Sequence, residues 1–201
     1  MIDLDKNARH AERMVRKKAV VDAKIALADK DKGLLLVLTG NGKGKNTSAL
    51  GMVARALGHG MNVCVLHFIK GRRDTGEENF FIQQPNVEWH VLGEGCTWDT
   101  QNFERDAAMA RKGWELAKTK LQDPCVDLIV LGELNYALKY GFLDTAIVLE
   151  DLVNRRPMQH IIITGRGAPS ALIEAADTVT EMLDTKHAFR AGIRGQRGIE
   201  L

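Results

Sequence analysis

Three glycines and two lysines near residue 40 have the types and spacing of a loop that binds phosphate. Gly40, Gly42 and Gly44 follow an apolar run, and Lys43 and Lys45 accompany them. Glycines at such positions let backbone N–H groups converge on an anion, and the start of a following helix adds partial positive charge. The stretch predicts a site for nucleotide phosphates between a strand and a helix. The alternative, an ordinary glycine-rich turn, leaves the ordered series of strand, glycines and lysines unexplained.

The same stretch departs from the general phosphate-loop motif G-x-x-x-x-G-K-[ST] at both ends. It keeps Gly44 and Lys45, but Thr39 stands at the first glycine and Asn46 at the final hydroxyl. We nevertheless expect the whole stretch to bind nucleotide. The expected binding residues are Thr39, Gly40, Asn41, Gly42, Lys43, Gly44, Lys45, Asn46 and Thr47.

Further polar side chains follow other apolar runs. Glu133 comes just after residues 128–131, where a second acidic motif directs a carboxylate at a metal ion; the alternative is a solvated carboxylate at a strand end. His67, Lys70 and Arg166 also stand at expected strand ends. Open α/β sheets bind ligands at the carboxyl ends of their strands, so these three residues are candidates for substrate contact.

The elements that position these residues alternate regularly. We expect strands at residues 34–39, 62–68, 87–91, 127–131, 160–164 and 178–182. Helical patterns lie between them, at residues 45–57, 101–121, 144–154 and 169–175. This alternation predicts an α/β fold, with a mostly parallel sheet flanked by helices on both faces.

The N-terminal part has a different pattern. Residues 10–29 carry apolar side chains at helical spacing among many charges, which predicts a basic amphipathic helix. The sheet does not need this helix, so we divide the chain into a helical arm, residues 1–32, and a phosphate-loop domain, residues 33–201. The arm either packs on the domain or on another subunit, or stays solvated and partly frayed.

Composition limits the partners. The chain has 201 residues, 45% of them hydrophobic, and its 28 basic and 26 acidic residues nearly cancel. This balance gives no reason to expect nucleic acid or an anionic membrane as a partner. No apolar stretch approaches the roughly 20 residues that span a bilayer, and the N-terminus lacks a secretory pattern. Three cysteines without CxxC spacing suit reduced thiols. We expect a cytoplasmic protein.

Several longer phrases resemble one family closely. From Gly33 onward they read "TGNGKGKNTSALGMVARALGHG", "HFIKG", "GCTWDTQN", "LGELNYALKYGFLD", "ITGRGAP", "DTVTEM" and "KHAFRAGIRGQRGIE". They resemble the corrinoid adenosyltransferase family, of the ATP:cob(I)alamin or cob(I)yrinic acid a,c-diamide type. The resemblance implies a homodimer with a P-loop NTPase-like (RecA-like) fold. It also implies transfer of the 5′-deoxyadenosyl group of ATP to the cobalt(I) of a reduced corrinoid, with release of triphosphate.

The resemblance gives the nucleotide-side residues their roles. Cobalt(I) is already a strong nucleophile, so the protein has to hold C5′ in line and neutralise the departing triphosphate. Lys43 and Lys45 suit the second task. Arg55, in the helix after the loop, is expected to contact nucleotide as its family counterpart is thought to; a surface ion pair is an equal alternative.

The metal side departs from the family pattern. The family has Asp-Glu where this chain has Gly132 and Glu133, and a hydroxyl where it has Asn46. We expect Mg²⁺ as cofactor, held by Glu133, Asn46 and Thr47. Because Mg²⁺ keeps much of its shell as water and phosphate, these losses should weaken its binding without abolishing it.

The segment expected to contact the corrinoid contains a third departure from the family pattern. The resemblance places a bulky aromatic at Cys96 and a tryptophan at Trp98, which are thought to crowd the lower corrin face so that the axial base leaves. Cys96 lacks that bulk and either forms a small apolar wall or approaches cobalt. The expected catalytic residues are Lys43, Lys45, Trp98 and Glu133, and the expected corrinoid contacts are His67, Lys70, Cys96, Trp98 and Arg166.

Two other functions compete with this prediction. A divergent relative that binds nucleotide or corrinoid with little or no turnover fits the three departures at Asn46, Cys96 and Gly132. A phosphate-loop ATPase or kinase fits the loop alone, but it leaves the "TWDTQN" and "LNYALKYGFLD" segments unexplained. For the enzyme, we expect a flavoprotein or another electron donor as a transient partner. The substrate is either complete cobalamin or an incomplete precursor.

Overall fold

A computed structural model describes residues 4–69, 75–93 and 102–200. The chain divides into two compact units, Met1–Lys32 and Gly33–Leu201. The first unit contains helix α1, Leu4–Ala26, whose side chains Val15, Val20 and Ile25 are exposed. An amphipathic helix is therefore present, although it begins earlier and ends earlier than residues 10–29. None of the helices in the described ranges is long and apolar enough to cross a membrane.

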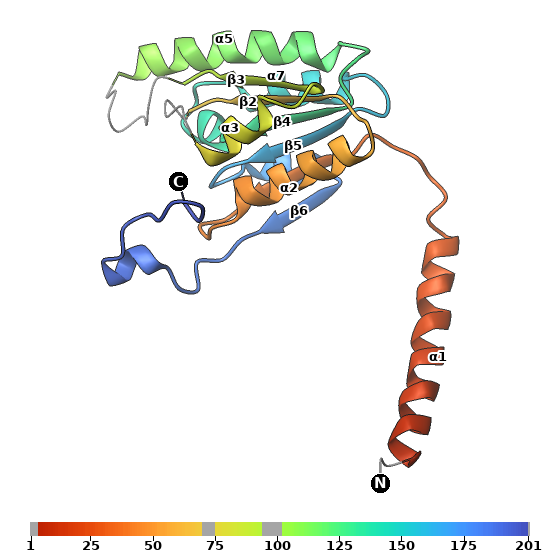
Figure 1. Ribbon diagram of the computed structural model, residues 1–201. Helices are drawn as coiled ribbons and strands as arrows, with labels where there is room; N and C mark the ends of the chain where they lie inside the picture. The colour runs from red at the N-terminus through yellow and green to blue at the C-terminus, as the bar shows by residue number, and fades with distance from the viewer. Residues whose placement is uncertain (1–3, 70–74, 94–101, 201) are drawn as a thin grey trace. The chain divides into compact units, whose positions relative to one another are not determined.

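The second unit is built on one parallel sheet (Figure 1). Its strands follow the order β3-β2-β4-β5-β1-β6, and every pair of neighbours is parallel. Their bounds are β1 Leu35–Thr39, β2 Val63–His67, β3 Val87–Val91, β4 Leu128–Gly132, β5 His160–Thr164 and β6 Thr178–Glu181. The predicted α/β class is confirmed, and each expected strand is found with its ends shifted by at most one residue.

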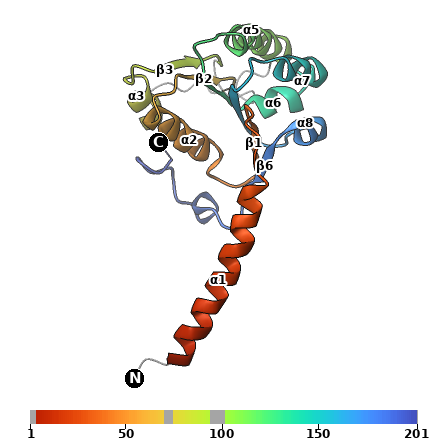
Figure 2. The same cartoon turned by 90° about the vertical axis from the view of Figure 1, so that its right-hand side faces the viewer.

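Helices cover both faces of this sheet (Figure 2). Leu50 of α2 and Phe81 of α3 belong to the core on one face, and Trp114 of α5 and Leu152 of α7 to the core on the other. The helix bounds are α2 Lys45–Gly58, α3 Gly76–Phe81, α5 Phe103–Leu121, α6 Leu134–Lys139, α7 Thr145–Val153 and α8 Ser170–Ala175, with a short 3₁₀ helix η1 at Ala188–Ala191.

Local capping explains several helix starts. Asp144 accepts hydrogen bonds from the N–H groups of Ala146 and Ile147 at the start of α7, as expected for an N-cap aspartate. Asn102 caps α5 through the N–H of Arg105. Helices α3, α6 and η1 were not expected from the sequence, because four to six residues offer few positions in which a helical period can be recognised. The equally short α8 was expected at residues 169–175 and begins directly after Pro169.

Candidate active site

The carboxyl ends of the parallel strands bring most of the expected residues to one edge of the sheet. The loop after β1 carries Lys45, β2 ends at His67, and Glu133 directly follows β4. Arg166 lies two residues beyond the end of β5. This edge is where an open α/β sheet forms its ligand site.

The glycine-rich loop, residues 39–46, is shaped by the segment that follows β6. The Gly42 N–H donates to the Met182 carbonyl over 2.6 Å. A Cβ atom at Gly40 would overlap the same carbonyl, and one at Gly42 would overlap the carbonyl of Leu183. Gly40 also has φ 90° and Gly44 φ 107°, which favour glycine. The loop therefore needs glycine for its packing and its backbone turn.

Lys45 lies inside this loop. Its Nζ donates to the carbonyl of Gly40 over 2.8 Å and to that of Gly42 over 2.6 Å, and the residue is only 8% exposed. Burial lowers the pKa of Lys45, as do the charges of Arg166 and Lys43, while Glu133 acts in the opposite direction. An ammonium has three donors, so two can hold the side chain while the third meets an anionic ligand.

A hydrogen-bonded triangle joins α2 to the ends of two strands. Asn46 Nδ2 donates to Glu133 Oε1 over 2.9 Å, and the Thr164 hydroxyl donates to Asn46 Oδ1 over 2.7 Å. The same hydroxyl accepts from the Glu133 N–H over 3.0 Å. Thr164 is fully buried. Asn46 therefore orients the Glu133 carboxylate, and its own amide oxygen is engaged by Thr164.

Glu133 itself has an uncommon backbone conformation. It has φ 60° and precedes the first residue of α6. Non-glycine residues with positive φ cost free energy and are often found where a side chain has a functional position. The Thr164 hydroxyl, through its bond to the Glu133 N–H, helps hold this turn. Thr164 was not among the expected site residues, although a hydroxyl at the end of the "HIIIT" run was a visible signal.

The structure explains why position 132 is glycine. His67 and Gly132 are register partners at the ends of β2 and β4. A Cβ atom at Gly132 would overlap the His67 ring, which is buried and lies 5.0 Å from the Trp89 ring, centroid to centroid. An aspartate at position 132 would thus displace His67. The two residues have to be considered together, which the sequence alone did not indicate.

A polar cavity of about 540 Å³ opens beside the glycine-rich loop. Its volume lies within the usual range for small-molecule sites. Two tyrosines border it, Tyr136 in α6 and Tyr140 directly after the helix, with ring centroids 6.0 Å apart and an interplanar angle of 23°. These tyrosines were not among the expected site residues, although two tyrosines four residues apart, three and seven positions after Glu133, were a visible signal. The other lining residues are Thr39, Gly40, Asn41, Lys139, Arg166, Gly167, Ala168, Ile173 and Glu181.

Other expected residues are placed differently. Arg55 lies in the last turn of α2, about 15 Å along the helix from Lys45 at about 1.5 Å per residue. There it lines a separate, mostly apolar groove with Leu34 and His160, at the amino edge of the sheet. The structure therefore does not bring Arg55 to the phosphate loop of its own chain.

Three expected corrinoid residues, Lys70, Cys96 and Trp98, lie outside the described residues.

On the nucleotide side, Thr47 is exposed in the first turn of α2. Lys43 forms an ion pair with Glu200 in the C-terminal tail, with Nζ 3.0 Å from Oε1. The tail therefore lies at the phosphate loop, and its carboxylate occupies a position that an anionic ligand would compete for.

Comparison with known proteins identifies the family of this chain. Residues 31–201 match the family model described as ATP:corrinoid adenosyltransferase BtuR/CobO/CobP. Residues 3–25 match a second model, described as the N terminal of cob(I)alamin adenosyltransferase. Together the two matches cover the glycine-rich loop, the Glu133 turn and helix α1.

Curated relatives align over nearly the whole chain. A corrinoid adenosyltransferase of Pseudomonas aeruginosa is 59% identical over 98% of this chain and 97% of its own length. One from Sinorhizobium sp is 45% identical over 96% of this chain and 92% of its own length. One from Escherichia coli K12 is 45% identical over 96% of this chain and 97% of its own length. The similarity extends over both units.

Proposed function

Because the chain belongs to the ATP:corrinoid adenosyltransferase family, we propose that it transfers the 5′-deoxyadenosyl group of ATP to cobalt(I) of a reduced corrinoid and releases triphosphate. One observation on this chain supports the proposal. Lys45 is buried in an intact glycine-rich loop, and Asn46 of the same loop orients Glu133. The departures at Asn46 and Gly132 therefore leave the glycine-rich loop and its buried lysine in place.

The residues of the loop supply what this reaction needs from a protein. The cobalt nucleophile attacks C5′, the C5′–O bond breaks, and both bonding electrons leave with the triphosphate. No proton has to be removed from the nucleophile, so a general base is not required. Lys45, Lys43 and the loop N–H groups stabilise the negative charge that develops on the leaving oxygen.

Mg²⁺ is the metal that this site fits best. Its available donors are oxygens: the Glu133 carboxylate, the Thr47 hydroxyl and the amide oxygen of Asn46, which are ligands suited to a hard cation. Bound Mg²⁺ would neutralise phosphate charge. Glu133 is already directed toward the loop by Asn46, whereas the Asn46 oxygen would first have to leave Thr164. We therefore assign Glu133 the main role.

The remaining assignments follow the family resemblance. His67 and Arg166 at the carboxyl edge, with Lys70, Cys96 and Trp98, are proposed to contact the corrinoid. A flavoprotein or another electron donor is proposed to supply cobalt(I). A homodimer and a cytoplasmic location complete the proposal, with neither nucleic acid nor membrane as a partner, in keeping with the net charge of +2.

An anaerobic assay tests the proposal. Chemically reduced cobalamin is mixed with the protein, ATP and Mg²⁺, and the cobalt(I) absorption is followed. We expect it to disappear only when protein and ATP are both present, and to persist with Lys45→Ala. Binding of ATP and cobalamin without any loss of the cobalt(I) absorption would favour the divergent binding protein instead.

A further inference from the structure

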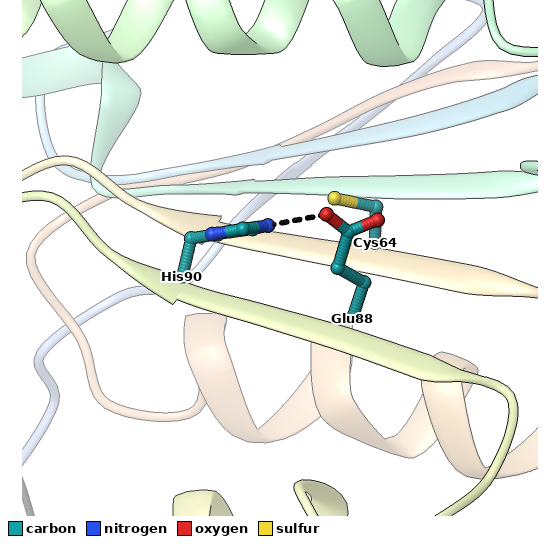
Figure 3. Close-up of side chains that lie close together, drawn as sticks. All are labelled: Cys64, Glu88 and His90. Carbon is teal, nitrogen blue, oxygen red and sulfur yellow. Dashed lines mark hydrogen bonds and ion pairs between the residues drawn. The ribbon is translucent and has the colours of Figure 1, made fainter.

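A cluster of three potential metal ligands lies on β2 and β3 (Figure 3). Cys64 on β2 and Glu88 on β3 are register partners, and His90 follows Glu88 on the same face of β3. One ligand atom from each side chain, Sγ, a carboxylate oxygen and a ring nitrogen, lies within 4.8 Å of the other two. Two neighbouring strands thus direct a thiol, a carboxylate and an imidazole at one point.

Two cationic or potentially cationic side chains contact Glu88 in this cluster. His90 Nε2 lies 2.7 Å from Glu88 Oε1, and Lys120 Nζ of α5 lies 2.7 Å from Glu88 Oε2. Burial alone would raise the pKa of Glu88, but the hydrogen bonds from Lys120 and His90 hold it below its ordinary value. Glu88 thus directs one oxygen toward His90 and the other toward Lys120.

Cys64 does not suit an alternative role as a reactive thiol. Its side chain is fully buried, and burial raises its pKa to about 12, with the charge of Glu88 adding to the effect. A thiol that stays protonated is a poor nucleophile. A bound cation changes this chemistry, because a coordinating thiol gives up its proton, here to solvent.

We propose that Cys64, Glu88 and His90 form a three-ligand site for a zinc-class divalent ion, with a fourth position open to water. Thiolate, imidazole and carboxylate are the donors that Zn²⁺ takes, at about 2.3 Å for sulfur and about 2.0–2.2 Å for nitrogen and oxygen. Tetrahedral geometry then separates donors by roughly 3.3–3.7 Å. To reach this geometry, the His90 and Glu88 atoms, now 2.7 Å apart, would separate by roughly 0.6–1 Å, and each would take a distance of roughly 3.3–3.7 Å from Cys64 Sγ, which now lies within 4.8 Å of both.

Solvent access to the cluster and the contact of Lys120 with Glu88 both favour binding of a metal ion. β3 is an edge strand, and the side chains of Glu88 and His90 are 43% and 29% exposed, so an ion can enter from solvent. Lys120 can remain on the second oxygen of Glu88, as an outer contact that fixes the orientation of a ligand. A thiolate ligand favours Zn²⁺ over the hard cation Mg²⁺, so this site is chemically distinct from the one proposed at Glu133.

The test uses the full chain, stripped of metal with a chelator and kept reduced. Zn²⁺ affinity and stoichiometry are measured by competition with a chromophoric chelator. Co²⁺ added to the same protein serves as a spectroscopic probe, because thiolate ligation gives a ligand-to-metal charge-transfer band. We expect one equivalent of bound ion and this band in the unmodified protein.

Three variants decide the outcome. Cys64→Ser should abolish the thiolate band, and the matched control Cys125→Ser, which alters an exposed thiol, should retain it. His90→Gln should weaken Zn²⁺ by at least about tenfold. If Cys64→Ser proves unfolded by circular dichroism, the His90→Gln affinity decides alone. A Co²⁺ band that persists in folded Cys64→Ser, or unchanged Zn²⁺ affinity in His90→Gln, would overturn the site. Neither readout depends on adenosyl transfer.

Discussion

At the residue scale, nucleotide binding is predicted to depend most directly on Lys45. Its ammonium is fixed by two loop carbonyls in a buried position, and each hydrogen bond to a charged group contributes about 1.5–3 kcal/mol. We predict that Lys45→Ala lowers ATP affinity by roughly 10- to 100-fold, measured by titration calorimetry. Lys43→Ala should have a smaller effect, because Lys43 is half exposed. Unchanged ATP affinity in Lys45→Ala would contradict the assignment of nucleotide binding to the glycine-rich loop.

The buried hydroxyl of Thr164 is predicted to support the metal ligand indirectly. Thr164→Val keeps the shape of the side chain but removes the bonds to Asn46 and Glu133, so two polar groups lose their partner. We expect a loss of about 1–3 kcal/mol in the free energy of unfolding. We also expect a higher Mg²⁺ concentration for half-maximal activity. A Mg²⁺ titration identical to that of the unmodified protein would show that the triangle does not orient Glu133.

Gly132 and His67 form a pair that can be tested by a double-mutant cycle. Gly132→Ala places a methyl group against the imidazole ring and should destabilise the protein by about 1–3 kcal/mol in urea unfolding. With His67→Ala as background, the same change should cost much less, because the ring is absent. Gly51→Ala in α2 is the matched control, since a Cβ there meets nothing within 4 Å. Additive effects of the two changes would contradict the steric explanation.

At the scale of elements, the C-terminal tail is predicted to compete with nucleotide for Lys43, a cation of the glycine-rich loop. Glu200 pairs with Lys43, and a nucleotide phosphate would have to replace this carboxylate. Exposed ion pairs contribute about 0–1 kcal/mol, so Glu200→Gln should raise ATP affinity by at most about fivefold. The gain should shrink at high salt, because screening already weakens the pair. Lower ATP affinity in Glu200→Gln would mean that the tail assists binding.

Helix α1 is predicted to serve the corrinoid side. Its apolar side chains are exposed within its own unit, and residues 33–201 hold the complete sheet. Deletion of residues 1–29 should leave a folded protein that binds corrinoid more weakly, as measured by equilibrium titration. Equal corrinoid affinity with and without the helix would exclude this role.

Strands and long helices could be predicted from the sequence, because buried parallel strands appear as short apolar runs and a helix such as α5 shows several turns of its period. The loop glycines and Lys45 were visible as a motif. The triangle of Asn46, Glu133 and Thr164 was not, because it joins residues up to 118 positions apart. Nor was the contact of His67 with position 132, since it depends on the strand order.

At the scale of the whole molecule, the strand order places the proposed chemistry. β1 lies between β5 and β6, so the loop after β1 contacts the segment after β6 and faces Arg166 after β5 across one cavity. β4, next to β5, adds Glu133 to the same edge. The cluster of Cys64, Glu88 and His90 lies on β2 and β3, at the opposite end of the strand order from β1 and β6. The two proposed sites can therefore be altered independently.

The most direct test of the central claim is the product balance of one anaerobic turnover. Reduced corrinoid, ATP and Mg²⁺ are mixed with the protein, and the phosphate products and the alkylated corrinoid are then quantified. The account predicts one inorganic triphosphate for each new cobalt–carbon bond, with neither product formed by Lys45→Ala. Release of orthophosphate or diphosphate without a cobalt–carbon bond would contradict adenosyl transfer and identify ordinary ATP hydrolysis instead.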